Sequence, residues 1–170
     1  MSGVTVKIDD RLVLRAINSI IDAAANPSNT LSRIGAVATD LVRLGFDNST
    51  DPYGRPWKPV LRAGGQPLRD TGNLANSWTY AVRGDAVAVG SNLTVTHDGR
   101  SHNLAAIHQH GATIRPVKAK ALRFMLNGKM VTAKKTVIRP RKMLPEGGWP
   151  NDWRDDVLEI VKRDIGAAFL

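Results

Sequence analysis

Several features are scarce or absent in this chain of 170 residues. It has no cysteine, which excludes a disulfide framework and a thiolate metal site and suits a reducing cytosol. No apolar run approaches the ~20 residues that a membrane-spanning helix needs, so we expect no membrane partner. The first ten residues are polar and end in two aspartates, which is not the pattern of a secretory signal.

The sequence has enough apolar residues for one folded domain, expected over residues 1–170. Hydrophobic residues make up 42% of the chain, which is typical of a globular protein with a sizeable core. The formal net charge is +9, a balance that favours nucleic acid, an acidic membrane surface or an acidic protein. The excess is concentrated between Arg115 and Lys142, where there is no Asp or Glu.

Helices are expected at both ends of the chain. The first would begin at Asp9 or Asp10 and end near Ala24, and the second would be capped by Thr30 and Gly45. A last helix would start at Asn151. The apolar stripes that predict them are Val13, Ile17, Ile20, Ile21 and Ala24; Ile34, Val37, Ala38 and Leu41; and Trp153, Val157, Ile160 and Val161.

The middle of the chain predicts short strands. After a long loop at 46–69 and a helical turn at 71–77 with Leu74 facing inward, strands are expected at 78–82, 86–90 and 104–110. Residues 92–101 are predicted as a polar loop. The fold class that follows is α+β, a mainly antiparallel sheet packed with two N-terminal helices and a C-terminal helix.

The strongest hairpin signal is Asn127-Gly128, flanked by 121–126 and 129–134. Asn-Gly accepts the positive φ angles that a type I′ turn requires. A two-stranded arm with this much charge is marginal alone, so we expect it to project and to become ordered on a partner. With its flanks, residues 115–142, it is the predicted basic arm.

Three interpretations of this arm stay open. It binds nucleic-acid phosphates, docks on an acidic protein surface, or is simply a solvated hairpin. Phe124 is its sole aromatic residue, so a base-stacking platform is poorly supported. The candidate contact residues are Trp57, Lys118, Lys120, Arg123, Phe124, Asn127, Gly128, Lys129, Lys134, Lys135, Arg139 and Arg141.

The tryptophans divide by their sequence context. Trp78 and Trp153 fit core positions, whereas Trp57 and Trp149 lie among prolines and glycines. Each of the latter two is either an exposed anchor for a partner or a core residue packed beneath a loop.

The sequence gives only weak evidence for a metal site or a catalytic triad. His108 and His110 would need a third metal ligand such as His97, His102 or Asp98. A triad of Ser77, His108 and Asp70 lacks a nucleophile elbow, and there is no phosphate-binding glycine loop. We therefore expect no cofactor and no enzyme, and a metal-dependent hydrolase is kept as a distant alternative.

Five blocks, in order along the chain, resemble the virion morphogenesis or tail completion family of Mu-like and related long-tailed phages. Three of them are Asp51-Pro52-Tyr53-Gly54-Arg55-Pro56-Trp57-Lys58-Pro59, Leu68-Arg69-Asp70-Thr71-Gly72-Asn73-Leu74-Ala75-Asn76-Ser77 and Val87-Ala88-Val89-Gly90. The fourth is Ala106-Ile107-His108-Gln109-His110-Gly111. The fifth, the hairpin with Ile138-Arg139-Pro140-Arg141-Lys142-Met143-Leu144, is similar to related head–tail joining proteins. It departs from them at Arg141-Lys142-Met143.

The resemblance implies a non-enzymatic virion protein at the head–tail junction or the head-proximal end of the tail. It also implies a homo-oligomeric ring, often six-fold, that contacts neighbouring neck and tail proteins such as the tail terminator, tail tube, connector or stopper. Non-specific contact with genomic DNA in the exit channel is the alternative that the charge suggests. Assembly would take place in the host cytoplasm.

Overall fold

The computed structural model describes residues 27–61, 64–97 and 99–166, together with residues 18 and 21. The helix predicted between residues 9 and 24 lies outside the described residues, except for 18 and 21, which are both helical. The remainder is an α+β fold in which every strand pairs antiparallel, as predicted. The strands form four separate two-stranded sheets rather than one continuous sheet.

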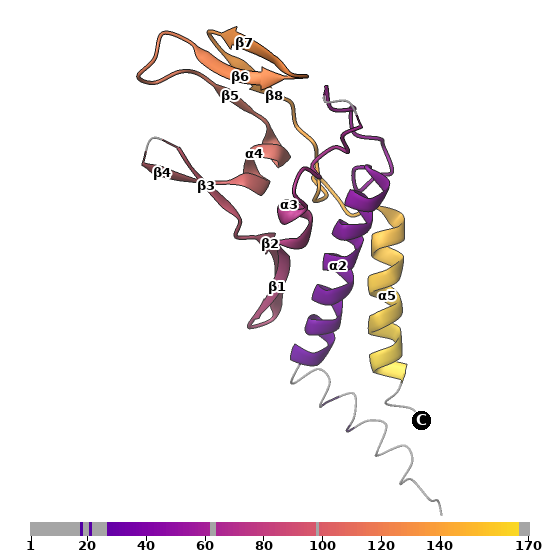
Figure 1. Cartoon of the computed structure of the whole chain (residues 1–170). Helices are drawn as coiled ribbons and strands as arrows, with labels where there is room; N and C mark the ends of the chain where they lie inside the picture. Colours follow the sequence, from indigo (N-terminus) through magenta and orange to yellow (C-terminus); the bar gives the residue numbers. More distant parts are fainter. Residues whose placement is uncertain (1–17, 19–20, 22–26, 62–63, 98, 167–170) are drawn as a thin grey trace, which may run out of the picture.

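Two long helices run side by side and support the rest of the molecule (Figure 1). They are α2 (Ser28–Asn48) and α5 (Asn151–Gly166). Near the amino end of α2, the Thr30 hydroxyl donates to Asp164 at 2.7 Å, and Arg33 forms an ion pair with the same carboxylate. The two helices are therefore antiparallel, with the carboxyl end of α5 fixed to the beginning of α2.

The ends of α2 differ from the prediction. Its N-cap is Pro27 rather than Thr30, whose hydroxyl is used by α5 instead. Gly45 lies inside the helix, and Ser49 takes the left-handed conformation that terminates it. The long predicted loop therefore begins at residue 49, because Phe46 extends the apolar face of the helix by one more turn.

The first two central strands lie close to the predicted ranges 78–82 and 86–90. The turn α3 (Asn73–Asn76) buries Leu74, as predicted, and leads into β1 (Trp78–Arg83) and β2 (Ala86–Ser91). This hairpin packs on α2, where Gly35 permits a close approach. A Cβ atom at Gly35 would lie 2.4 Å from the Tyr80 ring.

Two predictions for residues 92–110 are wrong. The segment predicted as a polar loop contains a hairpin of β3 (Thr94–His97) and β4 (Arg100–Asn103), for which Asp98-Gly99 in the sequence is the overlooked signal. The segment predicted as a strand is α4 (Leu104–His110). The Asn103 side chain caps this helix by accepting from the Ala106 N–H at 2.9 Å.

The error at α4 has a simple cause. Over seven residues, hydrophobic periodicity does not separate a strand from a short helix. The buried residues are Ala105 and Gln109, four apart, which is helical spacing. Gly111 ends the element, as predicted.

The last strands form the end of the molecule that lies away from the carboxyl end of α5 (Figure 1). They are β5 (Ala112–Ile114), which pairs with β8 (Thr136–Ile138), and the hairpin of β6 (Leu122–Leu126) and β7 (Lys129–Ala133).

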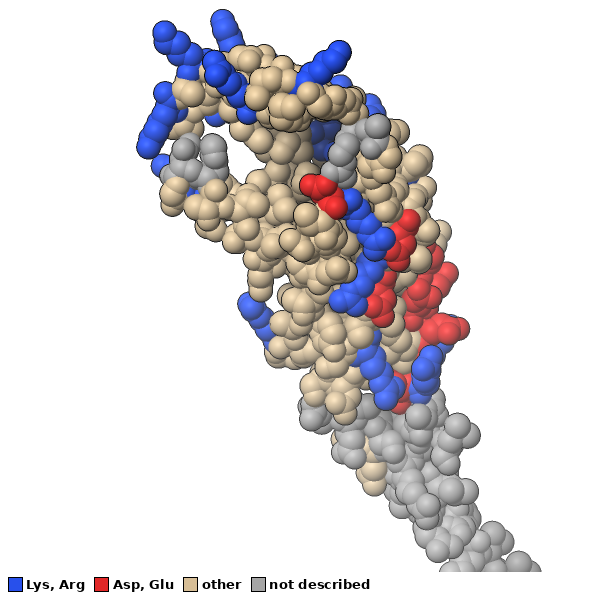
Figure 2. Space-filling view, viewed as in Figure 1, with Lys and Arg blue, Asp and Glu red and all other residues tan. Residues whose placement is uncertain are grey.

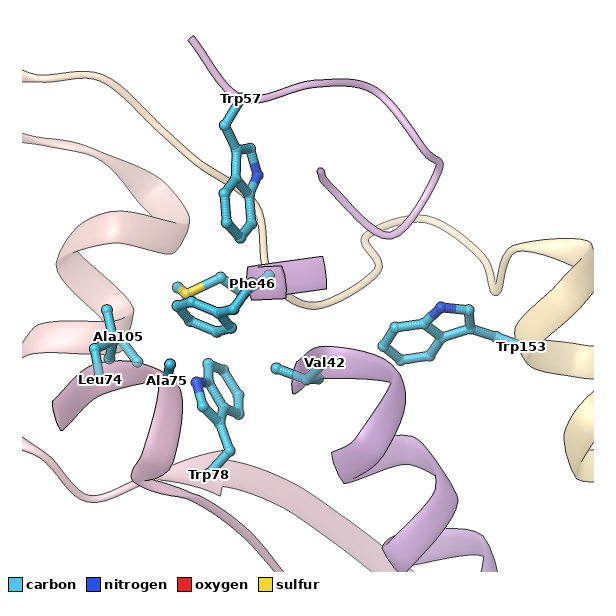
Figure 3. Close-up of a cluster of buried hydrophobic side chains, with 9 residues drawn as sticks. Val42, Phe46, Trp57, Leu74, Ala75, Trp78, Ala105 and Trp153 are labelled. Carbon is cyan, nitrogen blue, oxygen red and sulfur yellow. The ribbon is translucent and has the colours of Figure 1, made fainter. Parts of the chain in front are cut away.

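The core lies where α2, α3, α4 and α5 meet (Figure 3). Phe46 is completely buried, with the ring of Trp57 edge-on at 5.5 Å and that of Trp78 at 6.4 Å. The other buried members are Val42, Leu74, Ala75, Ala105, Met143 and Trp153. Trp78 and Trp153 are thus core residues, as predicted.

Candidate interaction surface

The loop after α2 is built to place Trp57 in the core. One Asp51 carboxylate oxygen accepts from the backbone N–H groups of Tyr53 and Arg55, both at 2.9 Å, and Gly54 adopts a φ of 76°. This tight turn reverses the chain direction, and the backbone N–H of Trp57 then donates to the Ser49 carbonyl at 2.8 Å. The first family-like block is therefore a structural turn.

Trp57 is 7% exposed, and its indole N–H donates to the Lys142 carbonyl at 3.1 Å. Of the two predicted roles, packing beneath a loop is the one observed, and Trp57 offers almost no surface to a partner. Trp149 differs, because it is 50% exposed and packs edge-on against Trp153 at 6.3 Å.

The side chain of Gln109 clamps the segment that precedes α5. Its Oε1 accepts from the N–H groups of Met143 and Leu144, at 2.8 and 3.1 Å, and its Nε2 donates to the Leu144 carbonyl at 2.9 Å. The amide thus substitutes for a strand partner. Gln109 lies in a family-like block of the sequence, but no local pattern indicates this clamping role.

Arg141 lies in the same segment before α5, and its hydrogen bonds fix it to the body rather than to the hairpin. Its backbone N–H donates to the His108 carbonyl at 2.7 Å, and its guanidinium donates to the Lys58 carbonyl at 3.1 Å. The side chain of Arg141, one of the predicted contact residues, is half-buried. Arg139, two residues earlier, is exposed.

His108 is affected by this packing. Burial, and secondarily the positive charge of Arg141, lower the pKa of His108 below its ordinary value of 6.5. Within the described part of the chain, the His108 Nδ1 and Arg141 Nε atoms are buried and have no hydrogen-bond partner.

The projecting part is shorter than predicted. Ile114 of β5 pairs with Thr136 of β8, so the chain leaves the body and returns to it at one paired base. Residues 115–135 between these two positions are called the basic arm from here on. Residues 136–142 belong to the body, because they carry β8 and the Arg141 junction.

The arm contains the predicted hairpin. Asn127 and Gly128 have φ angles of 50° and 75°, as a type I′ turn requires, and Leu126 pairs with Lys129 across them. Leu122, Phe124 and Leu126 alternate with exposed residues and make one half-buried face. On the opposite face Met125 pairs with Met130, and these side chains are 59% and 63% exposed.

The cations of the arm are on the surface. Among the residues that the structure describes, no carboxylate forms an ion pair with any of them. They are Arg115, Lys118, Lys120, Arg123, Lys129, Lys134 and Lys135. Figure 2 shows Lys and Arg gathered at this end of the molecule, whereas Asp and Glu gather along the side that carries α5.

The catalytic alternatives find no assembled site among the described residues. His108 and His110 lie on a helix, where residues two apart point to different sides. No group of three or more His, Cys, Asp or Glu side chains in the described ranges is placed to hold a metal ion. The Ser77 hydroxyl donates to the Leu74 carbonyl at 2.9 Å or meets Ser91 Oγ at 2.6 Å, so its bonding is structural.

None of the described helices combines the length and apolarity that a membrane span needs.

The chain was compared with known proteins. No curated protein and no solved structure matches it. A model of the phage virion morphogenesis family matches residues 8–165. This range includes the Asp51 turn, the α3 block, the Gln109 clamp and the hairpin. The chain therefore belongs to the phage virion morphogenesis family and has a structural role in building the virion.

Proposed function

We propose that this protein is a non-enzymatic ring component at the head–tail junction or the head-proximal end of the tail. In this proposal it completes the tail or joins it to the head, and the ring is a homo-oligomer, six-fold as in the resemblance. Its neighbours are neck and tail proteins such as the tail terminator, tail tube, connector or stopper. Family membership supports the role in virion building.

One observation carries the assembly role. The basic arm leaves the body at a single base, Ile114 paired with Thr136, and has exposed cations without carboxylate partners in the described part of the chain. A small two-stranded ribbon gains little stability from its own contacts. An arm of this kind is best stabilised by a partner, and in a ring each such contact is repeated by symmetry.

The structure suggests how the arm can be removed cleanly. Replacing residues 115–135 by Asn-Gly joins Ile114 to Thr136 through a two-residue turn and keeps the β5–β8 pair. We expect this variant to fold with nearly unchanged thermal unfolding. When it replaces the natural protein during phage growth, we expect few complete virions in electron micrographs.

A matched variant separates charge from shape. It keeps the hairpin but replaces its lysines and arginines by glutamine. If both variants assemble virions at the natural yield, the arm has no assembly role. Electron microscopy of labelled virions would locate the chain along the head–tail axis and show its symmetry.

The unpaired cations also favour a second function, contact with genomic DNA. Binding through phosphates weakens steeply with salt and is independent of sequence. A gel-shift of the full chain with duplex DNA at ~0.15 M salt tests this directly. Tight binding by the monomer, lost in the glutamine variant, would support a DNA-contacting role.

A further inference from the structure

The hairpin of β1 and β2 has an edge that no other described strand covers. The two strands pair with each other from Trp78–Ser91 to Arg83–Ala86, on either side of a two-residue turn. In the described part of the chain, no backbone hydrogen bond outside this ladder involves residues 86–90. The helix α2 packs on one face of the hairpin, mainly on β1 (Figure 1). The outer edge of β2 therefore stays open.

The alternation of an antiparallel ladder decides which backbone groups lie at this edge. In a two-residue hairpin the pair next to the turn exchanges both of its hydrogen bonds, and every second pair does the same. Arg83–Ala86 is the pair next to the turn, so the pairs that contain Val87 and Val89 fall between the bonded ones. The N–H and C=O groups of both valines consequently point away from β1.

β2 has none of the features that usually protect such an edge. Strands at a sheet edge are kept from pairing with other chains by charged side chains, proline or a bulge. Every other described strand of five or more residues contains a basic residue, namely Arg83, Arg123 or Lys129. β2 has the sequence Ala-Val-Ala-Val-Gly-Ser and pairs with β1 without a bulge. Its edge is therefore suited to the addition of a strand from another chain.

The open part of the edge is short, and both of its ends are fixed. The turn after β1 limits it at one end. At the other end the Ser91 carbonyl accepts from the Asn103 side-chain amide at 2.6 Å, so this carbonyl is not available to another strand. The alternation places the same carbonyl at the outer edge, in agreement with its binding to Asn103 rather than to β1. The open edge is thus residues 86–90, with Ala88 at its centre.

This edge is complementary to itself. When two copies run antiparallel about Ala88, Val87 of one lies opposite Val89 of the other, and the outward groups of both valines pair. Ala86 then lies opposite Gly90, and Ala88 lies opposite its own copy. Small side chains meet small ones, and no like charges face each other across the contact.

We propose that β2 of one copy pairs with β2 of a second copy of this chain, antiparallel and centred on Ala88. The product is a four-stranded sheet in the order β1-β2-β2-β1. The contact is isologous, so it closes on two copies and covers the open edge of both. It does not rest on the proposed ring, and it leaves the basic arm free.

The absence of cysteine from the chain allows a direct test. Across the proposed contact Ala88 faces its own copy in a non-hydrogen-bonded pair, at a Cα–Cα distance of about 4.5 Å that suits a disulfide. We expect the full chain with Ala88→Cys to form a covalent dimer under mild oxidation, seen on a non-reducing gel. Ala81→Cys is the matched control, because Ala81 is exposed and pairs with Ala88 within the hairpin but lies one strand away from the contact.

Proline variants test the backbone contact. Val89→Pro removes an outward N–H and no hydrogen bond of the β1–β2 ladder. The two-fold symmetry removes that bond twice, so we expect dimerisation in sedimentation velocity to weaken by about tenfold or more. Val82→Pro is the control, because it removes an outward N–H of β1 instead, and the dimer should persist. Circular dichroism and thermal unfolding check that both variants keep the fold.

A lysine pair replaces the proline pair where proline disturbs the fold. Ala88→Lys places two lysines opposite each other across the contact, whereas Ala81→Lys adds the same charge one strand away. We expect Ala88→Lys alone to weaken the dimer.

Each outcome decides the proposal. If Ala88→Cys cross-links no more than Ala81→Cys, the pairing of β2 with β2 is wrong, and another segment of the chain or a strand of another protein covers the edge. Equal weakening by both members of a variant pair, with the fold kept, overturns it as well. So does a natural chain that stays monomeric at every concentration. The ring is tested separately by its symmetry in electron micrographs.

Discussion

Gln109 and Met143 are 34 residues apart, yet the Gln109 side-chain oxygen accepts the Met143 N–H at 2.8 Å in the buried core. Met143 is 3% exposed, and Gln109 is 7% exposed. This bond, with those to Leu144, fixes the segment that joins the base of the arm to α5. Residues 137–149, which include this segment, line a surface groove of about 1280 Å³ together with residues 51–61, so Gln109 indirectly sets the shape of that groove.

The first prediction concerns this clamp. Gln109→Leu keeps the size of the side chain but leaves the Met143 N–H and the Leu144 groups unpaired. We expect the free energy of unfolding to fall by roughly 2–3 kcal/mol, the cost of buried unsatisfied polar groups. Urea unfolding measures it, with Ala106→Gln at an exposed position of α4 as the control. An equal effect of both substitutions would contradict a specific clamp.

Trp57 and Trp149 should respond differently to truncation. Trp57→Ala removes a buried ring that contacts Phe46, and we expect a loss of about 3–5 kcal/mol. Trp149→Ala removes a half-exposed ring, so we expect about 1 kcal/mol or less. Thermal unfolding of both variants compares them. A larger loss at Trp149 would show that the core has been assigned to the wrong tryptophan.

Glycine is required more strictly at position 111 than at position 128. Gly111 has φ 77° and ψ 167°, a conformation nearly restricted to glycine, and a Cβ there would lie 2.8 Å from the Ile138 carbonyl oxygen. Gly128 has φ 75° but faces open space. We expect Gly128→Ala to cost about 1–2 kcal/mol and Gly111→Ala to cost clearly more in urea unfolding. Comparable costs would argue against the contact at Ile138.

The pH dependence of stability should report His108. Its pKa is lower in the folded protein than in the unfolded chain, first because of burial and second because of Arg141. Below the ordinary pKa of 6.5, the unfolded state therefore binds more protons than the folded state. The contribution of His108 to the free energy of unfolding is thus complete above this pH and decreases as the pH drops below it. Thermal unfolding between pH 7.5 and pH 5 is the measurement.

A His108→Gln variant should lose part of this acid sensitivity. His102→Gln is the matched control, since this histidine is exposed on β4. If the two variants show the same dependence as the natural chain, His108 is not the group responsible.

Local signals were sufficient where a turn or cap decides the structure by itself. Asn127-Gly128 specified its hairpin, and Gly72 with Leu74 specified the helical turn. They were insufficient at 104–110, where the helix depends on the Asn103 cap and on burial of Gln109 beneath a distant segment. The apolar pattern of these seven residues indicates neither the cap nor the burial.

The sequence by itself determined the α+β class, the basic hairpin and the resemblance to a phage family, because these depend on turn chemistry, charge and ordered motifs. Tertiary structure alone decided that Trp57 is a core residue, that Arg141 joins the body and that the arm is confined to 115–135. Each depends on a partner far along the chain: Lys142 for Trp57, Lys58 for Arg141 and Thr136 for Ile114. Hydrogen bonds and burial select these partners only after the chain has folded, which is why no local pattern records them.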